Sequence, residues 1–298
     1  MAVFKGSAVA IVTPFKKEDQ SLNFDAFADI IDQQIDGGSD AIVVCGSTGE
    51  AATMSEQEHM DTIRFCIEHT KHRVPVIAGT GSNCTATAKH LTKQAVEYGA
   101  DAVLVITPYY NKATQNGLIA HFRTVAAEAG STPLIMYNVP SRTGCNILPA
   151  TVAALVKDVP NIVGIKEASG NLSQIGQLMA LTDGNIELYS GNDDQTVPIM
   201  SIGGLGVISV VANVAPREMH DLCAKFFAGD IAGAAKLQRE IYPLFEKLFS
   251  EVNPIPVKMA MNLLGLNAGP VRLPLTEMEP EHTEKLRQVM ADFGLLKA

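Results

Sequence analysis

One lysine ends an apolar segment of this sequence. The run IVGI, at positions 162–165, is followed directly by Lys166, and its length and composition are typical of a buried strand. An unperturbed lysine has a pKa of about 10.4, whereas apolar surroundings disfavour the cation and lower the pKa. A neutral amine can attack a carbonyl carbon and form a Schiff base. The lysine therefore allows imine chemistry, although a lysine that snorkels to Glu167 or another carboxylate is an equally simple interpretation.

Two hydroxyl-bearing residues follow another apolar run. In GSTGE, at positions 46–50, two glycines flank Ser47 and Thr48. Glycines allow tight turns, and the backbone N–H groups and hydroxyls of such a turn can surround a small anion such as a carboxylate. An ordinary tight turn could have the same sequence, so this motif alone indicates a site only weakly.

Phenols and a guanidinium follow two further runs. TPYYN supplies Tyr109 and Tyr110, and YNVPSRTG supplies Tyr137 and Arg142. Tyrosine can transfer protons, and arginine can bind a carboxylate through two parallel hydrogen bonds. Each residue also has an ordinary interpretation, as a cover on the core or a surface cation. Together with the amine and the hydroxyls, these groups suit carbon–carbon bond formation by a 2-oxo acid.

The elements that must position these residues alternate along the chain. Eight short β-branched runs are separated by segments with helical spacing, which predicts parallel strands covered by helices in an α/β fold. The simplest architecture is a (β/α)8 TIM barrel, whose active site would lie at the carboxyl ends of the strands. An open doubly wound sheet is the alternative, although the first run lacks the Gly-rich turn typical of that fold. The runs are residues 7–14, 41–46, 75–81, 102–108, 133–140, 162–167, 186–192 and 206–210.

The sixth run has a predicted orientation in this barrel. Because strand side chains alternate between faces, Ile162, Gly164 and Lys166 should share the interior face. Gly164 would leave room beneath the lysine stem. Val163 and Ile165 would then contact the surrounding helices.

The chain after the eighth run is predicted to be helical. We expect a catalytic barrel over residues 1–228 and a helical extension, residues 229–298, packed on it. NPIPVK, at positions 253–258, should interrupt the helices. An apolar stripe favours a helix before that interruption and consists of Leu237, Ile241, Leu244, Phe245 and Leu248.

Composition excludes several classes of partner. The net charge of −9 and the pI near 5.3 argue against nucleic acid and anionic membranes, which require clustered basic residues. The five cysteines are widely spaced and unpaired in sequence, which favours buried thiols in a reducing compartment. No segment is typical of a signal peptide or reaches the length of a membrane span. We therefore expect a cytoplasmic protein without a membrane partner.

Eight motifs, in order and over essentially the whole chain, resemble the dihydrodipicolinate synthase (4-hydroxy-tetrahydrodipicolinate synthase) family of the pyruvate-dependent class I aldolase superfamily. The resemblance implies a lyase that condenses pyruvate with L-aspartate 4-semialdehyde to 4-hydroxy-tetrahydrodipicolinate, the committed step of diaminopimelate and L-lysine biosynthesis. It implies no metal or organic cofactor, and self-association as a homodimer or a homotetramer, a dimer of dimers. The motifs are GSTGE, GTGSN (79–83), TPYYNK (107–112), YNVPSRTG (137–144), GIKEASGN (164–171), YSGND (189–193), GVISV (206–210) and NPIPVK.

The resemblance also implies roles for individual residues. Lys166 would form the Schiff base with pyruvate, and Tyr137 would be the proton donor and acceptor. Thr48 would link Tyr137 to Tyr110 in a proton relay, with Tyr110 reaching into the site of a neighbouring subunit. Arg142 would bind the carboxylate of the semialdehyde. The pyruvate pocket would consist of Ser47, Thr48, Gly191 and the backbone around Ile208.

Two features of the sequence point to different second substrates. The usual hydroxyl pair of the family is two threonines, whereas Ser47 in the first position is common in N-acetylneuraminate lyases of the same superfamily. Arg142 and the Tyr109–Tyr110 pair favour the synthase. A non-catalytic oxo-acid sensor and a pyridoxal-phosphate enzyme are further alternatives. A metal enzyme is disfavoured because the histidines offer only the pair His69 and His72.

A regulatory cleft for L-lysine is also implied by the resemblance. His59, Asn83 and Tyr109 keep the pattern of lysine-sensitive members, and Glu56 is a familiar variant. Thr87 replaces a carboxylate that would pair with the lysine amino group. We therefore expect weak or absent inhibition by L-lysine. The full candidate set is Ala51, Ala52, Glu56, His59, Asn83, Thr87 and Tyr109.

Overall fold

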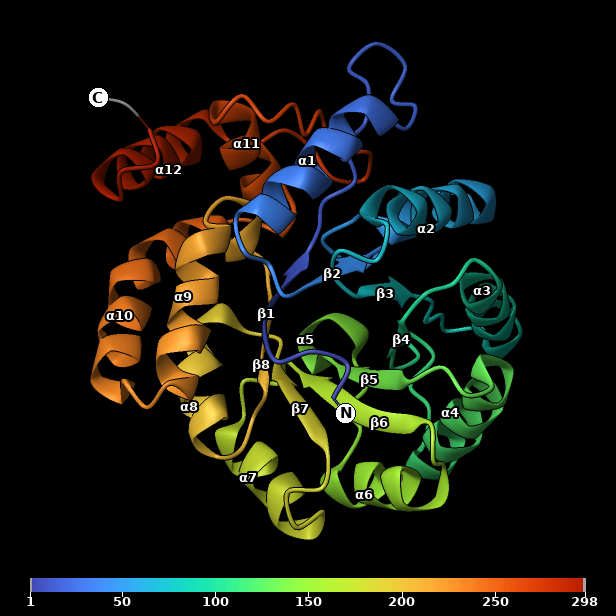
Figure 1. Cartoon of the computed structure of the whole chain (residues 1–298). Coiled ribbons are helices and arrows are strands. Elements are labelled where there is room, and N and C mark those ends of the chain that lie inside the picture. The colour runs from blue at the N-terminus through green and yellow to red at the C-terminus, as the bar shows by residue number, and fades with distance from the viewer. Residues whose placement is uncertain (1, 297–298) are drawn as a thin grey trace.

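The computed structural model describes residues 2–296, and its centre is a closed parallel barrel (Figure 1). The strands follow one another in chain order, and β8 pairs with β1. The predicted TIM barrel is confirmed, and the open-sheet alternative is wrong because the first and last strands share a ladder. The strands are β1 (Gly6–Ala10), β2 (Ala41–Val44), β3 (Val76–Gly79), β4 (Ala102–Ile106), β5 (Leu134–Asn138), β6 (Ile162–Glu167), β7 (Glu187–Ser190) and β8 (Gly206–Ser209).

Helices surround the barrel and follow its strands (Figure 1). Several begin at a polar cap: the Ser55 hydroxyl accepts a hydrogen bond from the Glu58 N–H group, and the Glu58 carboxylate accepts one from the Ser55 N–H group. Three short 3-10 helices are η1 (Ala51–Thr53), η2 (Asp193–Gln195) and η3 (Val211–Asn213). The α-helices are α1 (Phe24–Asp36), α2 (Glu56–Thr70), α3 (Thr85–Glu97), α4 (Gln115–Ala129), α5 (Pro140–Thr143), α6 (Pro149–Asp158), α7 (Leu172–Leu181), α8 (Thr196–Ser201), α9 (Pro216–Phe227), α10 (Ile231–Leu248), α11 (Ile255–Leu263) and α12 (Pro280–Asp292).

The strands are apolar on both faces because each face contacts a separate core. A large cluster fills the layer between strands and helices, and a smaller one fills the barrel interior. Burial of apolar area on both sides is the main stabilising contribution of such strands. The interior cluster includes Ala8, Val43, Ile77, Leu104, Ile135, Tyr137, Tyr189 and Ile208.

Strand β6 departs from simple alternation. Its pairing with β5 shifts by one residue, so that Leu134 and Ile135 lie opposite Ile162 and Gly164. Ile162 therefore joins Ile165 in the outer cluster, and Val163 packs against the interior cluster. The predicted orientations of Ile162 and Val163 were wrong because a β-bulge adds one residue to the strand.

The glycine in this bulge also has a different task from the predicted one. A Cβ atom on Gly164 would lie 2.4 Å from the main-chain oxygen of Glu187 on β7. Gly164 therefore permits close approach of two strands and does not make room for the lysine stem. That clearance comes from Gly191, where a Cβ atom would lie 3.1 Å from Cε of Lys166.

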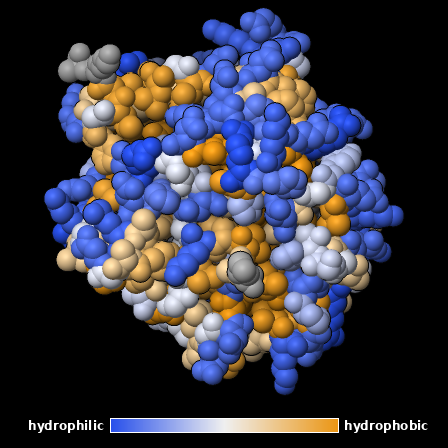
Figure 2. Space-filling view, viewed as in Figure 1, coloured by the Kyte–Doolittle hydropathy of each residue, from blue (hydrophilic) through white to orange (hydrophobic). Residues whose placement is uncertain are grey.

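The amino-terminal segment covers one end of the barrel. The Phe4 ring stacks on the buried Tyr189 ring, with 4.2 Å between centroids, and the Tyr189 hydroxyl donates to the Phe4 carbonyl oxygen. Figure 2 shows this end of the molecule, with hydrophobic residues gathered near the amino terminus inside a largely hydrophilic rim. The carboxyl ends of the strands lie at the opposite end.

The helices after the barrel gather on one side of it, beside α9 and α1 (Figure 1). The predicted apolar stripe lies on the side of α10 that faces the protein core, where Ile241, Leu244 and Leu248 are buried. The interruption is shorter than predicted, because α11 already begins at Ile255 and Pro256 is tolerated in its first turn. One cluster includes side chains from both the barrel and the extension. The division at residue 228 remains a prediction.

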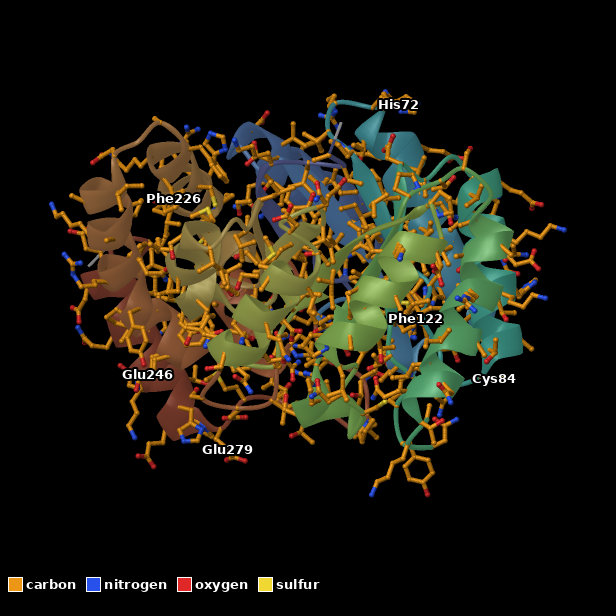
Figure 3. All side chains as sticks on the ribbon, turned by 90° about the horizontal axis from the view of Figure 1, so that it is seen from below. His72, Cys84, Phe122, Phe226, Glu246 and Glu279 are labelled. Atoms are coloured by element: carbon orange, nitrogen blue, oxygen red, sulfur yellow. The ribbon has the colours of Figure 1, made fainter. Side chains whose placement is uncertain are left out.

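The cysteines are free thiols, as the sequence predicted. Four are buried, but Cys84 is exposed because it occupies the position before α3, in a loop instead of a packed face. Figure 3 shows the barrel from the side, with Cys84 in the loop after β3 at the lower end and His72 after α2 at the upper end. Within residues 2–296, no helix combines the length and the apolar composition needed to cross a bilayer.

Candidate active site

Lys166 is buried at the carboxyl end of β6, and only 6% of it is exposed. The pKa of Lys166 is lowered to about 8, chiefly by burial; the carboxylate of Asp193 opposes this shift, and the positive charge of Arg142 adds to it. A substantial share of the amine is therefore neutral near neutral pH, as imine formation requires. Among residues 2–296, no carboxylate lies within 4.0 Å of the Lys166 ammonium group.

Glu167 has its own partners, so the interpretation of Lys166 as a snorkelling partner of Glu167 is wrong. The Asn138 amide donates to both carboxylate oxygens at 3.1 Å, and the Ser169 N–H group donates to Oε1 at 2.8 Å. Successive strand residues point to opposite faces, so Glu167 points away from the barrel interior. Burial raises the pKa of the Glu167 carboxyl group, and these hydrogen bonds oppose that rise.

Tyr137 lies beside Lys166 on the neighbouring strand. The two residues are register partners of β5 and β6, and the Lys166 ammonium nitrogen lies 4.6 Å from the centre of the Tyr137 ring. Burial raises the pKa of the Tyr137 phenol, while the charge of Arg142 and a hydrogen bond with the Ser47 side chain lower it. The phenol is therefore protonated at neutral pH and stands where a proton donor to a lysine-bound substrate is needed.

The GSTGE segment forms a fixed loop after β2. Thr48 is buried, and its hydroxyl oxygen accepts a hydrogen bond of 3.0 Å from the side-chain amide of Asn253. Glu50 has a φ of 54°, in the left-handed region, and its carboxylate accepts from Nζ of Lys258 at 2.7 Å and from the N–H group of Arg272 at 2.9 Å. The middle and the carboxyl end of this loop are thus held by groups from the carboxyl-terminal extension.

Arg142 comes from the short helix α5, directly after β5. One of its guanidinium nitrogens donates to the main-chain oxygen of Asn253 at 3.1 Å. The residue is exposed and lines the cavity described below, so its other donors can reach a ligand. An arginine at the mouth of the barrel suits a carboxylate-bearing substrate.

A cavity of about 490 Å³ adjoins part of this site, although Lys166 and Thr48 are not among its lining residues. Ser47, Tyr137 and Arg142 line it, which brings three of the predicted catalytic and substrate-binding residues together. The same cavity extends to most of the predicted regulatory residues. In a single chain, the predicted catalytic and regulatory residues therefore line one continuous cavity. The regulatory residues that line it are Ala51, Ala52, Glu56, His59, Thr87 and Tyr109.

The remaining regulatory residue lies at the edge of this region. The main-chain oxygen of Asn83 accepts a hydrogen bond of 2.9 Å from the Asn111 side chain.

His59, which lines the cavity, is buried, and its Nε2 lies 2.7 Å from the Gly79 oxygen. Burial lowers the pKa of its imidazole. A neutral His59 therefore gives this part of the cavity no positive charge at neutral pH.

Tyr110 does not enter the cavity of its own chain. It is 88% exposed and has a φ of 74°, and its N–H group donates to the Thr143 oxygen at 3.0 Å. In the single chain, the Thr48 hydroxyl accepts from Asn253, and the Ser47 side chain, not Thr48, lowers the pKa of the Tyr137 phenol. The predicted relay from Tyr137 through Thr48 to Tyr110 is not assembled within one chain.

Gly191 and Ile208, the remaining residues of the predicted pyruvate pocket, are both in the barrel region. Gly191 passes close to the lysine stem, and Ile208 is a buried member of the interior cluster. Asp193 was missed as a functional residue, although it ends the YSGND motif. It is buried, accepts hydrogen bonds from the Ser209 hydroxyl and the Val210 N–H group, and acts electrostatically on Lys166.

Metal ligands are not clustered in the part of the chain that the structure describes. No group of three or more His, Cys, Asp or Glu side chains there is arranged to hold an ion. His69, from the sequence pair considered above, lies 3.0 Å from the Asp32 carboxylate.

Comparison with known proteins identifies the family. The model of the dihydrodipicolinate synthetase family matches residues 3–292. The chain belongs to this family. Among family members, 4-hydroxy-tetrahydrodipicolinate synthase of Lachnoclostridium phytofermentans is 56% identical over 296 residues, which cover 99% of this chain and 100% of the relative. The resemblance inferred from the eight motifs is thereby confirmed.

Solved structures from the same family share the whole fold. Dihydrodipicolinate synthase from Aquifex aeolicus is 44% identical, with a TM-score of 0.96 over 99% of this chain and 100% of that one. The enzyme from Cyanidioschyzon merolae, solved with lysine bound, is 39% identical, with a TM-score of 0.96 over the same shares of the two chains. The barrel with its helical extension is therefore the architecture of these relatives.

Proposed function

We propose that this chain is the lyase that condenses pyruvate with L-aspartate 4-semialdehyde to 4-hydroxy-tetrahydrodipicolinate, in diaminopimelate and L-lysine biosynthesis. The observation that carries the proposal is the buried Lys166, whose pKa is lowered to about 8 beside a protonated Tyr137. The relatives named above as synthases, and not as sialate lyases, support this reading over N-acetylneuraminate lyase.

The first half of the reaction activates pyruvate. The neutral amine of Lys166 attacks the ketone carbon, and Tyr137 donates a proton to the oxygen, which leaves as water. Loss of a methyl proton from the imine then gives an enamine, which is a carbon nucleophile. Ser47, Thr48, Gly191 and the backbone at Ile208 form the pocket for the pyruvate carboxylate.

The second half forms the new carbon–carbon bond. The enamine attacks the aldehyde carbon of the semialdehyde, whose carboxylate is bound by Arg142, and the aldehyde oxygen takes a proton. The substrate amine then attacks the imine carbon and displaces Lys166, which closes the ring and regenerates the free amine. Every proton in this sequence moves between substrate, Tyr137 and its relay, so the steps balance without an oxidant or a cofactor.

Assembly of the relay belongs to a homodimer or a homotetramer in this proposal. The exposed phenol of Tyr110 at the mouth of the barrel supports a role toward a second copy, in which it would complete the link from Thr48. The cytoplasm is the proposed location of this biosynthetic reaction.

The test is a pair of rate measurements at equal enzyme concentration. We expect turnover with pyruvate plus aspartate semialdehyde and none with pyruvate plus N-acetylmannosamine. Turnover only with the amino sugar would make the protein a sialate lyase and give weight to Ser47. Binding of pyruvate without product from either acceptor would favour an oxo-acid sensor.

A further inference from the structure

Asn253 lies in the connection between α10 and α11, far in sequence from the catalytic motifs. It lines the cavity with Ser47, Tyr137 and Arg142, yet only 5% of it is exposed. Figure 3 shows Glu279, which precedes α12, at the same lower end of the molecule as Cys84 in the loop after β3. The extension thus reaches the end of the barrel where the catalytic loops lie.

Asn253 contacts two of the proposed active-site residues at once. Its main-chain oxygen accepts from Arg142 at 3.1 Å, and its side-chain Nδ2 donates to Oγ1 of Thr48 at 3.0 Å. The side-chain Oδ1 is buried and has no hydrogen-bond partner among residues 2–296. Burial of an amide that makes a single side-chain hydrogen bond costs stability, so the fold alone does not account for it.

The direction of the bond to Thr48 restricts what that hydroxyl can do. An amide nitrogen is only a donor, and a hydroxyl has one hydrogen together with lone pairs that accept. Because Oγ1 of Thr48 accepts from Asn253, its own hydrogen is free for another acceptor. That hydrogen can therefore be donated to an anionic or phenolic oxygen in the site.

The loop that carries Thr48 is held by further buried contacts. The carboxylate of Glu50 is bonded to Lys258 and to the N–H group of Arg272, and the Thr13 hydroxyl donates to the Gly49 oxygen at 2.7 Å. These contacts fix the backbone around Thr48, so rotation of the hydroxyl hydrogen is its main remaining freedom. Asn253 restricts that rotation, because its Nδ2 donates to Oγ1 of Thr48 and so directs the hydroxyl hydrogen elsewhere.

We propose that Asn253 is a positioning residue that sets the polarity of the Thr48 hydroxyl, so that Thr48 donates its hydrogen to the bound substrate or the proton relay. This inference rests on the proposed function, in which Thr48 contacts pyruvate and links Tyr137 to Tyr110. It assigns the carboxyl-terminal extension a defined task in the reaction: the control of one hydrogen in the active site.

The test compares two substitutions of the same residue. Asn253→Asp offers only acceptor oxygens when ionised, so Thr48 must donate to it and loses its hydrogen for the substrate. Asn253→Ala removes the amide but leaves the Thr48 hydrogen free. We expect Asn253→Asp to lower kcat/KM at least about tenfold, the scale of one hydrogen bond to a charged group, and Asn253→Ala to lower it much less. Merely structural support predicts that the two losses of kcat/KM follow the loss of unfolding free energy in each variant, which urea denaturation measures and which includes the cost of burying a carboxylate.

A double-mutant cycle with Thr48→Val makes the test specific. If the Asn253 side chain acts only through Thr48, neither Asn253 substitution lowers kcat/KM further in the Thr48→Val background. Multiplicative losses in the double variants would overturn the proposal, as would Asn253→Asp activity within about threefold of wild type. If Asn253→Asp does not fold, Asn253→Ala decides the matter: a loss of about tenfold or more that persists in the Thr48→Val background would overturn the proposal.

Two controls separate other causes. Asn185→Asp adds the same charge at an exposed asparagine before β7, near the opposite end of the barrel, and should be neutral. Rates are compared on the pH plateau of each variant, because a new carboxylate beside Arg142 would offset the positive charge that lowers the pKa of Lys166. Wild-type turnover with pyruvate and aspartate semialdehyde is measured alongside. Its absence would overturn the proposed function and this inference together, whereas wild-type turnover with the reverse order of losses would overturn the inference alone.

Discussion

The ammonium nitrogen of Lys166 and the ring centre of Tyr137 lie 4.6 Å apart on neighbouring strands. The electron-rich ring face stabilises the cation modestly, whereas burial disfavours it, and burial is the larger effect because the pKa falls to about 8. The amine is therefore close to half-ionised slightly above neutral pH. Lys166 can therefore attract the pyruvate carboxylate in its protonated form and attack the ketone carbon in its neutral form.

The rate of imine formation should depend on pH through Lys166. Only the neutral amine attacks, so kcat/KM for pyruvate should rise with pH and level off above a pKa of about 8. Steady-state rates across the pH range measure this rise of kcat/KM. A limb near the unperturbed lysine pKa of about 10.4 would show that Lys166 is not desolvated in solution.

Lys166→Ala should abolish covalent trapping of pyruvate by borohydride. Lys258 is a matched internal control, since burial lowers its pKa to about 8 as well, but its ammonium group is bonded to Glu50 at 2.7 Å. Its nitrogen donates to both Glu50 and the Pro270 oxygen, so it is not free to approach a ketone carbon. Peptide mass mapping of the trapped wild type should therefore find the adduct on Lys166, and an adduct on Lys258 would identify a different nucleophile.

Tyr137→Phe should lower turnover about 10²-fold or more, the usual loss for an acid–base group. The ring and its contact with Lys166 remain in this variant, so the free energy of unfolding should change little. Turnover and urea denaturation of both proteins measure the two effects. Turnover close to that of wild type would assign proton transfer to another group.

Arg142→Ala should raise KM for the semialdehyde about tenfold or more while KM for pyruvate changes little, because a charged hydrogen bond to one substrate is lost. Arg142→Lys keeps the charge but cannot form two parallel hydrogen bonds, so it should recover only part of the loss. Initial rates with each substrate varied in turn provide the comparison. Equal effects on both KM values would contradict the assigned role.

L-Lysine should inhibit the enzyme weakly or not at all. Thr87 lines the cavity where a carboxylate would be needed to pair with the lysine amino group, and His59 is uncharged at neutral pH. Inhibition curves for the wild type and for Thr87→Glu measure the effect. The substitution should strengthen inhibition, and strong inhibition of the wild type would show that Glu56 is a sufficient partner.

The sequence alone predicted the barrel and most of the proposed site, because these depend on local patterns. Apolar runs marked the strands, and Lys166 was conspicuous as a cation at the end of one. The orientation of Val163 could not be predicted, since the bulge arises from pairing with β5 and has no local signal. Asn253 was missed for a similar reason: nothing near it in sequence indicates that it meets Thr48.

The contacts between the carboxyl-terminal extension and the GSTGE loop also determine the stage of protein synthesis at which this loop can reach its final geometry. Its donors, Asn253, Lys258 and the N–H group of Arg272, follow all eight strands in the sequence and therefore leave the ribosome after them. A nascent chain that has already formed its eight strands still lacks the groups that hold Thr48 and Glu50. The GSTGE loop therefore acquires its full set of supporting contacts only after the chain has been translated beyond Arg272.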